Sequence, residues 1–510
     1  MLERRSILRG AGALSLGGML GSGIAWSRPT APVLMLLPSA SHDALAIKLL
    51  LDAPPSAPPV LTIAGRPVHA ARMDPDGYSW AFIQRGLDAG SSFELKLMDA
   101  SGRALRDPWP LRTLPPPDSL PERFRILFFT CAGGGAGFLP IAFRRALLDR
   151  ALSFAPDLAV ANGDHVYWDL ATVLKHRGTA KRRAEIANIY RKTAWIDEDL
   201  PFDSEPNRRA LNTIVGQQIG ALYEDRFASV PTIFVADDHD YFENDDAGSW
   251  GYAFPPRPFT YNLQRRAADM AYPVALGRPL LGGDEISGAV ESLRVGKLLE
   301  MNLFDCRRSV SFGKDAGTLS PAVESYLVRR LRLSDSMQLI HVPSNPMGWS
   351  AGKLGEWYDD PPSAKSYFGN DKGYWQQGWF DQHQRLAMAL SAQPNRAAVS
   401  ISGDIHASAG SVISRSGDFD LAANPIHTIL PGPLGTADFG FPSSARGIAA
   451  FHPSALAVKD IAPMEERNGF TLVDVLADRM EVRQFRWRPP EPVQAISTLR
   501  PAHSYTIQRP

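Results

Sequence analysis

The sequence predicts an α/β domain preceded by a small all-β domain, and three observations support this. Residues 29–114 hold short β-like runs separated by Pro- and Gly-rich clusters. After Pro121, five short apolar runs each lead into Asp, His, Cys or Asn, as expected for strands buried on both faces of a sheet. Helix-like stretches, such as 142–152 and 181–192, lie between these runs. The strand ends of such a domain place polar side chains along one edge of the sheet.

Length and charge exclude some classes of protein. The chain has 510 residues, with 54 Lys plus Arg against 54 Asp plus Glu, and a pI near 7.2. A polybasic nucleic-acid binder is therefore disfavoured, because such domains usually have a pI above about 9. Hydrophobic residues make up 44% of the chain, enough for large cores, and two cysteines exclude a disulfide scaffold.

Residues 1–27 resemble a twin-arginine export signal. Arg4 and Arg5 precede a Gly-rich apolar stretch at 11–24, and small residues at 25–27 offer a cleavage point. An ordinary N-terminal helix or a membrane anchor is the alternative, but the stretch is short for a bilayer core of about 30 Å. We expect a soluble, monomeric protein, exported by the twin-arginine machinery to the periplasm or the outside.

The all-β part is expected to be a small sandwich of the immunoglobulin or fibronectin type over residues 29–114. Its strand-like runs lie at 44–51, 60–65, 78–83 and 93–103, with a turn at 74–77. The Pro-rich segment 115–121 reads as a stiff linker to a catalytic domain over 122–510.

The five apolar runs of the second domain each end at residues that can carry chemistry. The runs are 125–130, 157–161, 232–236, 337–340 and 398–402. Near the chain's end, 471–475 and 480–487 alternate like the two strands of a structural hairpin.

Side chains near these strand ends form a set suited to metal ions. Carboxylates suit hard cations, whereas thiolate, imidazole and phenolate ligands select transition metals. Asp404 and His406 are separated by one residue, so an extended backbone points both the same way. An isolated Gly-Asp pair usually lies in a turn, but here several clusters converge. The candidates are too many for one ion and favour two metals about 3.5–4 Å apart. They are Cys131, Asp164, Tyr167, Asp238, Asn244 or Asp245, Asp404 and His406.

These residues match a family pattern. The order NGD, DDHD and SGDIH resembles the calcineurin-like metallophosphoesterase superfamily. Within it, FTCAGG, NGDHVYWD, DDHDYFEND and SGDIHAS resemble the alkaline phosphatase D (PhoD-like) branch, as do FDCRRSV at 304–310 and the segment 371–385. The resemblance spans nearly the whole mature chain. It implies a two-sheet α/β/β/α sandwich after the small β domain.

The resemblance also implies roles for single residues. Asp164 would bridge the metals, and Cys131 and Tyr167 would make one site suited to ferric iron. His239 would protonate the leaving oxygen or stabilise the transition state. Asp238 stands where many superfamily members carry a metal-binding Asn, and Asp404 and His406 replace a two-His motif. The implied cofactors are two or more ions, Fe³⁺ with Ca²⁺, or alternatively Zn, Mn or Mg.

Some positions depart from the pattern or stay open. His165 replaces a frequent Tyr, and Trp168 stands where an acid is expected. His341 is either a ligand of the second metal or a histidine at the edge of the core. Arg307 either binds a phosphate oxygen or belongs to a solvated face.

The predicted function is hydrolysis of phosphoesters by metal-activated hydroxide, as an exported phosphatase or phosphodiesterase acting on a small-molecule or lipid phosphoester. A phospholipase D-like enzyme on lipid head groups and a non-catalytic exported protein that retains the fold are the alternatives. Export favours a disulfide between Cys131 and Cys306. We instead predict that Cys131 is a metal ligand and Cys306 a buried free thiol.

Overall fold

The computed structural model describes most of the chain. The described residues are 33–134, 139–168, 194, 196–197, 199–241, 258–276, 278–279, 290–352, 355–359, 375–436, 442–443 and 448–510. The export signal predicted for 1–27, the helix predicted for 181–192 and the candidate ligands Asn244 and Asp245 lie outside them. Within the described part, no helix is long and apolar enough to cross a membrane.

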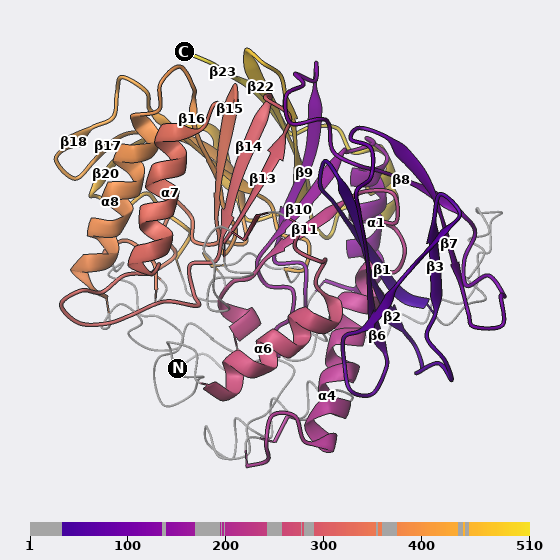
Figure 1. Cartoon of the computed structure of the whole chain (residues 1–510). Helices are drawn as coiled ribbons and strands as arrows, with labels where there is room; N and C mark the ends of the chain where they lie inside the picture. The colour runs from indigo at the N-terminus through magenta and orange to yellow at the C-terminus, as the bar shows by residue number, and fades with distance from the viewer. Residues whose placement is uncertain are drawn as a thin grey trace.

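Two four-stranded sheets form the N-terminal sandwich, drawn in indigo and violet in Figure 1. Short strands form here because short, mostly apolar runs lie between Pro- and Gly-rich turns. Leu36, Ile47, Leu61, Leu95 and Trp109 fill the core between the sheets. The first sheet contains β1 (Val33–Ala40), β2 (Ala44–Leu51), β6 (Ser79–Arg85) and β5 (Ala70–Arg72), in that order. The second contains β4 (Arg66–Val68), β3 (Val60–Ile63), β7 (Ser92–Met98) and β8 (Trp109–Arg112).

A six-stranded sheet forms one half of the second domain. Its order is β11 (Thr232–Val235), β10 (Leu158–Asn162), β9 (Phe124–Thr130), β21 (Asn468–Val475), β22 (Arg479–Trp487) and β23 (His503–Gln508). The first three strands are parallel, so their carboxyl ends lie at one edge. The predicted C-terminal hairpin is confirmed as the antiparallel pair of β21 and β22, which attaches to β9.

A nine-stranded sheet forms the other half. Its order is β12 (Arg278–Pro279), β13 (Val290–Val295), β14 (Leu299–Phe304), β15 (Gln338–Pro343), β16 (Ala398–Ile401), β19 (Ile426–Pro431), β17 (Ser408–Ser416) and β18 (Phe419–Asp420), and β20 (Leu456–Glu465) pairs with β17. Strands β14, β15, β16 and β19 run parallel. Their carboxyl ends therefore also share one edge.

Helices cover the outer faces of the two facing sheets, and the predicted fold class is confirmed. Ile126 and Val160 of one sheet share a buried core with Ile340, Val399 and Ile401 of the other. The six-stranded sheet is covered by α1 (Ile141–Leu152), α4 (Glu205–Val215) and α6 (Pro258–Ala271). The nine-stranded sheet is covered by α7 (Pro321–Leu333) and α8 (Gln377–Ser391), which lie side by side in Figure 1.

The N-terminal sandwich packs against the helical layer of the second domain. All eight residues of β2 are buried, because one face of the strand fills the sandwich core and the other meets the helices. Leu50 belongs to the same buried cluster as Ile214 of α4. Lys48 Nζ donates to the carbonyl of Asp269, and Ser79 Oγ donates to that of Met270 at 2.6 Å. The sandwich is thereby attached to the domain that carries the strand-end residues.

Truncation of Leu50 tests this attachment. Leu50 is 2% exposed at the boundary between the two domains, so we expect Leu50→Ala to lower the free energy of unfolding by about 2–5 kcal/mol, the usual cost of a cavity. Urea unfolding measures it. Leu333→Ala is the control, because Leu333 is 67% exposed and its truncation should change little. An equal effect of the two substitutions would contradict the packing described here.

Candidate metal centre

The strand-end residues converge where the two sheets meet. Cys131 follows β9, Asp164 follows β10, and Asp238 begins a 3₁₀ turn, η2 (Asp238–Tyr241), just after β11. Asp404 and His406 follow β16 of the other sheet. The backbone joins the two edges, because the Thr130 amide donates to the Gly432 carbonyl at 3.1 Å. Parallel strands from both sheets thus bring their polar ends to one place.

Three overlapping groups of side chains have ligand atoms within 4.8 Å of one another. The first is Cys131, Asp164 and His406; the second is Asp164, Asp238 and His239; the third is Asp237, Asp238 and Asp404. Asp164 belongs to the first two groups and Asp238 to the last two, so these two aspartates connect the three groups, as residues shared by neighbouring ions would. Asp237 was not among the residues predicted from the sequence, although it is the first letter of the DDHD motif.

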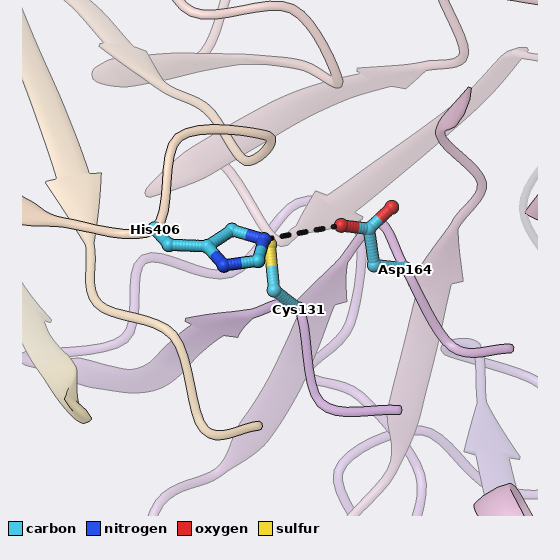
Figure 2. Close-up of side chains that lie close together, drawn as sticks. All are labelled: Cys131, Asp164 and His406. Carbon is cyan, nitrogen blue, oxygen red and sulfur yellow. Dashed lines mark ion pairs between the residues drawn. The ribbon is translucent and has the colours of Figure 1, made fainter. Parts of the chain in front are cut away.

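The first group combines a thiol, a carboxylate and an imidazole, with a phenol beside them. Figure 2 shows Cys131, Asp164 and His406 turned toward one another, with His406 Nε2 3.6 Å from Asp164 Oδ2. The Tyr167 hydroxyl donates to Asp164 Oδ2 at 2.9 Å and lies 3.1 Å from His406 Nε2. Cys131, Asp164 and Tyr167 are each at most 1% exposed. Mixed S, N and O donors of this kind suit a transition metal.

The backbone is strained at three of the candidate ligands predicted from the sequence. Cys131, Asp164 and Asp404 have φ values of 47°, 55° and 66°, in the left-handed region that non-glycine residues rarely adopt. Such conformations cost on the order of 1–3 kcal/mol each and persist only where the surroundings enforce them. Each of the three follows a strand end. The left-handed backbone conformation there turns the candidate ligand side chain toward the common centre.

Side chains outside the groups hold the loop after β9. Arg144 of α1, 3% exposed, donates from Nη1 to the carbonyls of Ala132 and Gly133, both at 2.9 Å. Gln218 Oε1 accepts from the amides of Gly134 at 2.8 Å and Tyr167 at 2.9 Å. Gln218 lies in a π-helical turn, η1 (Gly216–Gly220), and such turns are frequent at functional sites. Sequence reasoning did not identify either residue.

Asp240 connects the two loops that carry the other aspartates. Its Oδ1 accepts from the amides of His165 at 2.9 Å and Val166 at 3.0 Å, and its Oδ2 accepts from the Asp237 amide at 3.0 Å. Burial, followed by the charge of Asp164, raises the pKa of Asp240 to about 8. The last acid of DDHD is therefore a structural connection between the loops after β10 and β11.

His239 occupies the more open side of the centre. Its ring centroid lies 4.3 Å from that of Tyr167, and the residue is half-buried, whereas Asp238 beside it is buried. His239 thus lies at the centre's accessible side, close to Asp164 and Asp238. A group that exchanges a proton with a bound molecule needs such a position.

The donor set fits metal ions. Four buried aspartates converge here: Asp164, Asp237, Asp238 and Asp404. Burial raises the pKa of Asp237 despite its ion pair with Arg307, and Asp237 Oδ2 has no hydrogen-bond partner among the described residues. Burial, followed by Asp164, also raises the pKa of the Cys131 thiol and the Tyr167 phenol well above their usual values. Cations would offset the buried negative charge and lower both of these pKa values.

The remaining candidates lie elsewhere or have other partners. Cys306 is buried and, like Cys131, forms no disulfide. Arg307 is 1% exposed and paired with two aspartates, so the solvated face considered from the sequence is wrong. His341 belongs to none of the three groups. The strand end predicted at residue 340 is also wrong: β15 pairs with β14 as far as Pro343, which places His341 inside the strand.

His341 lies under the helices of the nine-stranded sheet. Its ring centroid is 4.5 Å from that of Phe304, and neither ring nitrogen has a hydrogen-bond partner among the described residues. Burial, followed by the charge of His383, lowers the pKa of His341 to about 3, and burial does the same for His383. Both residues are therefore neutral in the folded protein at ordinary pH.

These two histidines predict a loss of stability in acid. In the unfolded chain a histidine has a pKa near 6.5, so below that pH protons favour the unfolded state until the folded pKa is reached. At pH 4.5 each histidine is expected to cost about 2–3 kcal/mol relative to pH 7.5. Urea unfolding of His341→Leu at both pH values should show a smaller acid loss than the wild type. His69→Leu, at an exposed position, is the control and should show the full loss.

Comparison with known proteins finds similar structures but no similar sequence. No family model matches the sequence, and no curated protein matches it significantly. The structure is similar to one described as "Structure of PhoD", with a TM-score of 0.62 and 13% identity over 94% of this chain and 91% of that chain. The chain has the fold of PhoD. The purple acid phosphatase PPD1 from yellow lupin (Lupinus luteus) seeds is also similar, with a TM-score of 0.57 and 12% identity over 95% of this chain and 75% of that one.

The shared PhoD fold extends over the whole described architecture. Because the match to PhoD covers 94% of this chain, it includes the N-terminal sandwich as well as the two facing sheets. The fold places the centre at the carboxyl ends of parallel strands, where ligand sites of α/β sheets usually lie.

Proposed function

We propose that the chain is an exported, metal-dependent phosphoesterase of the PhoD-like family, with at least two metal ions. The observation that carries the proposal is the convergence of a thiol, a phenol, an imidazole and four buried aspartates, with Asp164 shared between two groups. A protein that had kept only the fold would not be expected to retain such a donor set. Export is supported by the pattern of residues 1–27.

The donors divide into two kinds of site. Cys131, Tyr167 and His406 would hold the ion that prefers sulfur, phenolate and nitrogen, and ferric iron is our first choice for it. Asp237, Asp238 and Asp404 offer only oxygen, which suits Ca²⁺ or another hard divalent ion. When bound, the two cations supply Lewis acidity and neutralise the charge that develops on the phosphoryl group.

The protein's own groups would orient the substrate and move the proton. His239 lies beside Asp164 and Asp238 on the more open side, and this supports our assignment of its imidazole as the group that protonates the leaving oxygen. The hydrogen bonds between the side chains of Arg144, Gln218 and Asp240 and the backbone keep the ligand loops in position before any ion binds. Such preorganisation is what electrostatic catalysis requires.

Metal content and substrate range test the proposal. Mature protein from the periplasm should contain iron and a divalent ion, and should hydrolyse p-nitrophenyl phosphate, bis-p-nitrophenyl phosphate or both, with loss of activity on metal removal. Active enzyme with less than about half an equivalent of any such metal would contradict it. Faster hydrolysis of micellar phospholipid than of either soluble ester would favour the lipid-directed alternative.

The two cysteines provide a matched pair for the iron site. Cys131→Ser should weaken iron binding and bleach any thiolate or tyrosinate charge-transfer colour, because it removes the sulfur ligand. Cys306→Ser changes a thiol that is equally buried but outside the ligand groups, and should be nearly silent. Absorption spectra measure the charge-transfer colour of both variants, and elemental analysis measures their iron content. A Cys131–Cys306 disulfide in active enzyme, found by non-reducing peptide mapping, would instead indicate a calcium- or zinc-only site.

A further inference from the structure

Arg307 is buried among carboxylates at the metal centre. Its Nε donates to Asp237 Oδ1 at 2.7 Å, and its Nη2 lies 3.3 Å from Asp404 Oδ2. The three side chains are at most 1% exposed. Its neighbour Arg308 is different, because it is only partly buried and donates from Nε to the Tyr241 hydroxyl at 3.1 Å. Arg307 therefore contacts two members of the third ligand group, Asp237 and Asp404.

The two carboxylates that Arg307 contacts come from opposite sheets. Asp237 follows β11 of the six-stranded sheet, whereas Asp404 follows β16 of the nine-stranded sheet. Arg307 itself follows β14 of the nine-stranded sheet. The planar guanidinium presents several N–H groups in a fixed fork, so one side chain can set the relative orientation of two carboxylates.

The charge in this group leaves room for a cation. When ionised, Asp237, Asp238 and Asp404 carry three negative charges, and the guanidinium offsets one of them. Asp237 uses Oδ1 for the guanidinium, and its Oδ2 has no hydrogen-bond partner among the described residues. Excess buried charge is costly unless it is paired or coordinates a metal. A hard divalent ion on the carboxylate oxygens would balance the group.

We propose that Arg307 is a positioning residue for the divalent ion held by Asp237, Asp238 and Asp404, and that it does not bind substrate. The guanidinium holds the carboxylates of Asp237 and Asp404 so that this oxygen site is formed in advance. The Cys131, Asp164 and His406 group contains neither of those two aspartates, so it does not depend on Arg307 in this way. The inference rests on the proposed function only in that the centre binds two kinds of metal.

The test compares Arg307→Met, Arg307→Lys and the control Arg308→Met in the full mature protein. Each variant is loaded with iron and then titrated with Ca²⁺, and calcium affinity, iron content and charge-transfer absorption are measured. We expect Arg307→Met to weaken Ca²⁺ binding by at least about tenfold, as loss of a ligand's supporting partner usually does, while iron content and colour remain. Arg307→Lys should recover part of the affinity, and Arg308→Met should behave as the wild type.

Several outcomes would overturn the inference. Unchanged calcium affinity with a raised KM for phosphoester would assign Arg307 to substrate. Equal loss of iron and calcium in a variant that keeps the wild-type Tm, or an equal effect of Arg308→Met, would show that its role is not specific to the oxygen site. If Arg307→Met does not fold, Asp237→Asn must produce the same selective loss of Ca²⁺. A wild-type protein that binds neither metal would overturn the proposed function itself, which separates the two failures.

Discussion

Asp164→Asn is expected to abolish both turnover and tight metal binding. Asp164 is fully buried and belongs to two of the three ligand groups, and the second of these shares Asp238 with the oxygen-only group. Replacing one of its carboxylate oxygens by an amide therefore removes a ligand and a negative charge where the groups meet. Tyr167 and His406 also lie around its Oδ2 at 2.9 and 3.6 Å, so the first group would lose its central acceptor. Elemental analysis and turnover of p-nitrophenyl phosphate measure the effect.

Asp157→Asn is a matched control for this experiment. Asp157 immediately precedes the same strand, β10, but it is exposed at the opposite end, where its Oδ2 accepts from the Arg125 amide at 2.8 Å. Metal content and turnover should match those of the wild type. If Asp164→Asn kept both metals with near-normal turnover, Asp164 would not be the bridging residue.

His239→Ala is expected to slow turnover by about 10²–10⁴-fold while metal content stays unchanged. That range is the usual contribution of a general acid. The reason is the position of His239 on the accessible side of the centre, with its ring centroid 4.3 Å from that of Tyr167, where it can reach a leaving oxygen. The loss should shrink for an ester whose leaving group needs no proton. Comparing p-nitrophenyl and alkyl phosphates measures this difference.

Metal content separates the two roles open to His239. The residue lies within ligand distance of Asp164 and Asp238, so its loss could also remove an ion. Loss of metal in His239→Ala would make it a ligand and would leave the proton donor unassigned. His42→Ala, at an exposed position on the sandwich, should change neither metal content nor rate.

Much of the fold was predictable because its strands have a strong local pattern. The runs that became β9, β10, β11 and β16 are continuous and apolar, since both faces of each strand are buried. Their boundaries were predicted to within a residue or so. The prediction failed at β15, where His341 looks like a polar strand end but occupies a buried position inside the strand. Pattern alone does not show whether a histidine after an apolar run lies beyond the strand or beneath a helix.

The residue types that stand at the strand ends follow from the sequence alone, because those side chains come directly after apolar runs and the carboxyl ends of parallel strands share an edge. Cys131, Asp164, Asp404 and His406 were identified in this way. The packing of the two sheets is what shows which of them lie in one ligand group, that Asp237 belongs with them, and that Arg307 contacts two aspartates. The hydrogen bonds of Gln218 and Asp240 could not be predicted from the sequence either, since each joins segments that are far apart along the chain. Such contacts depend on how the two sheets and their loops pack, and a local periodicity in the sequence does not show which distant segments meet.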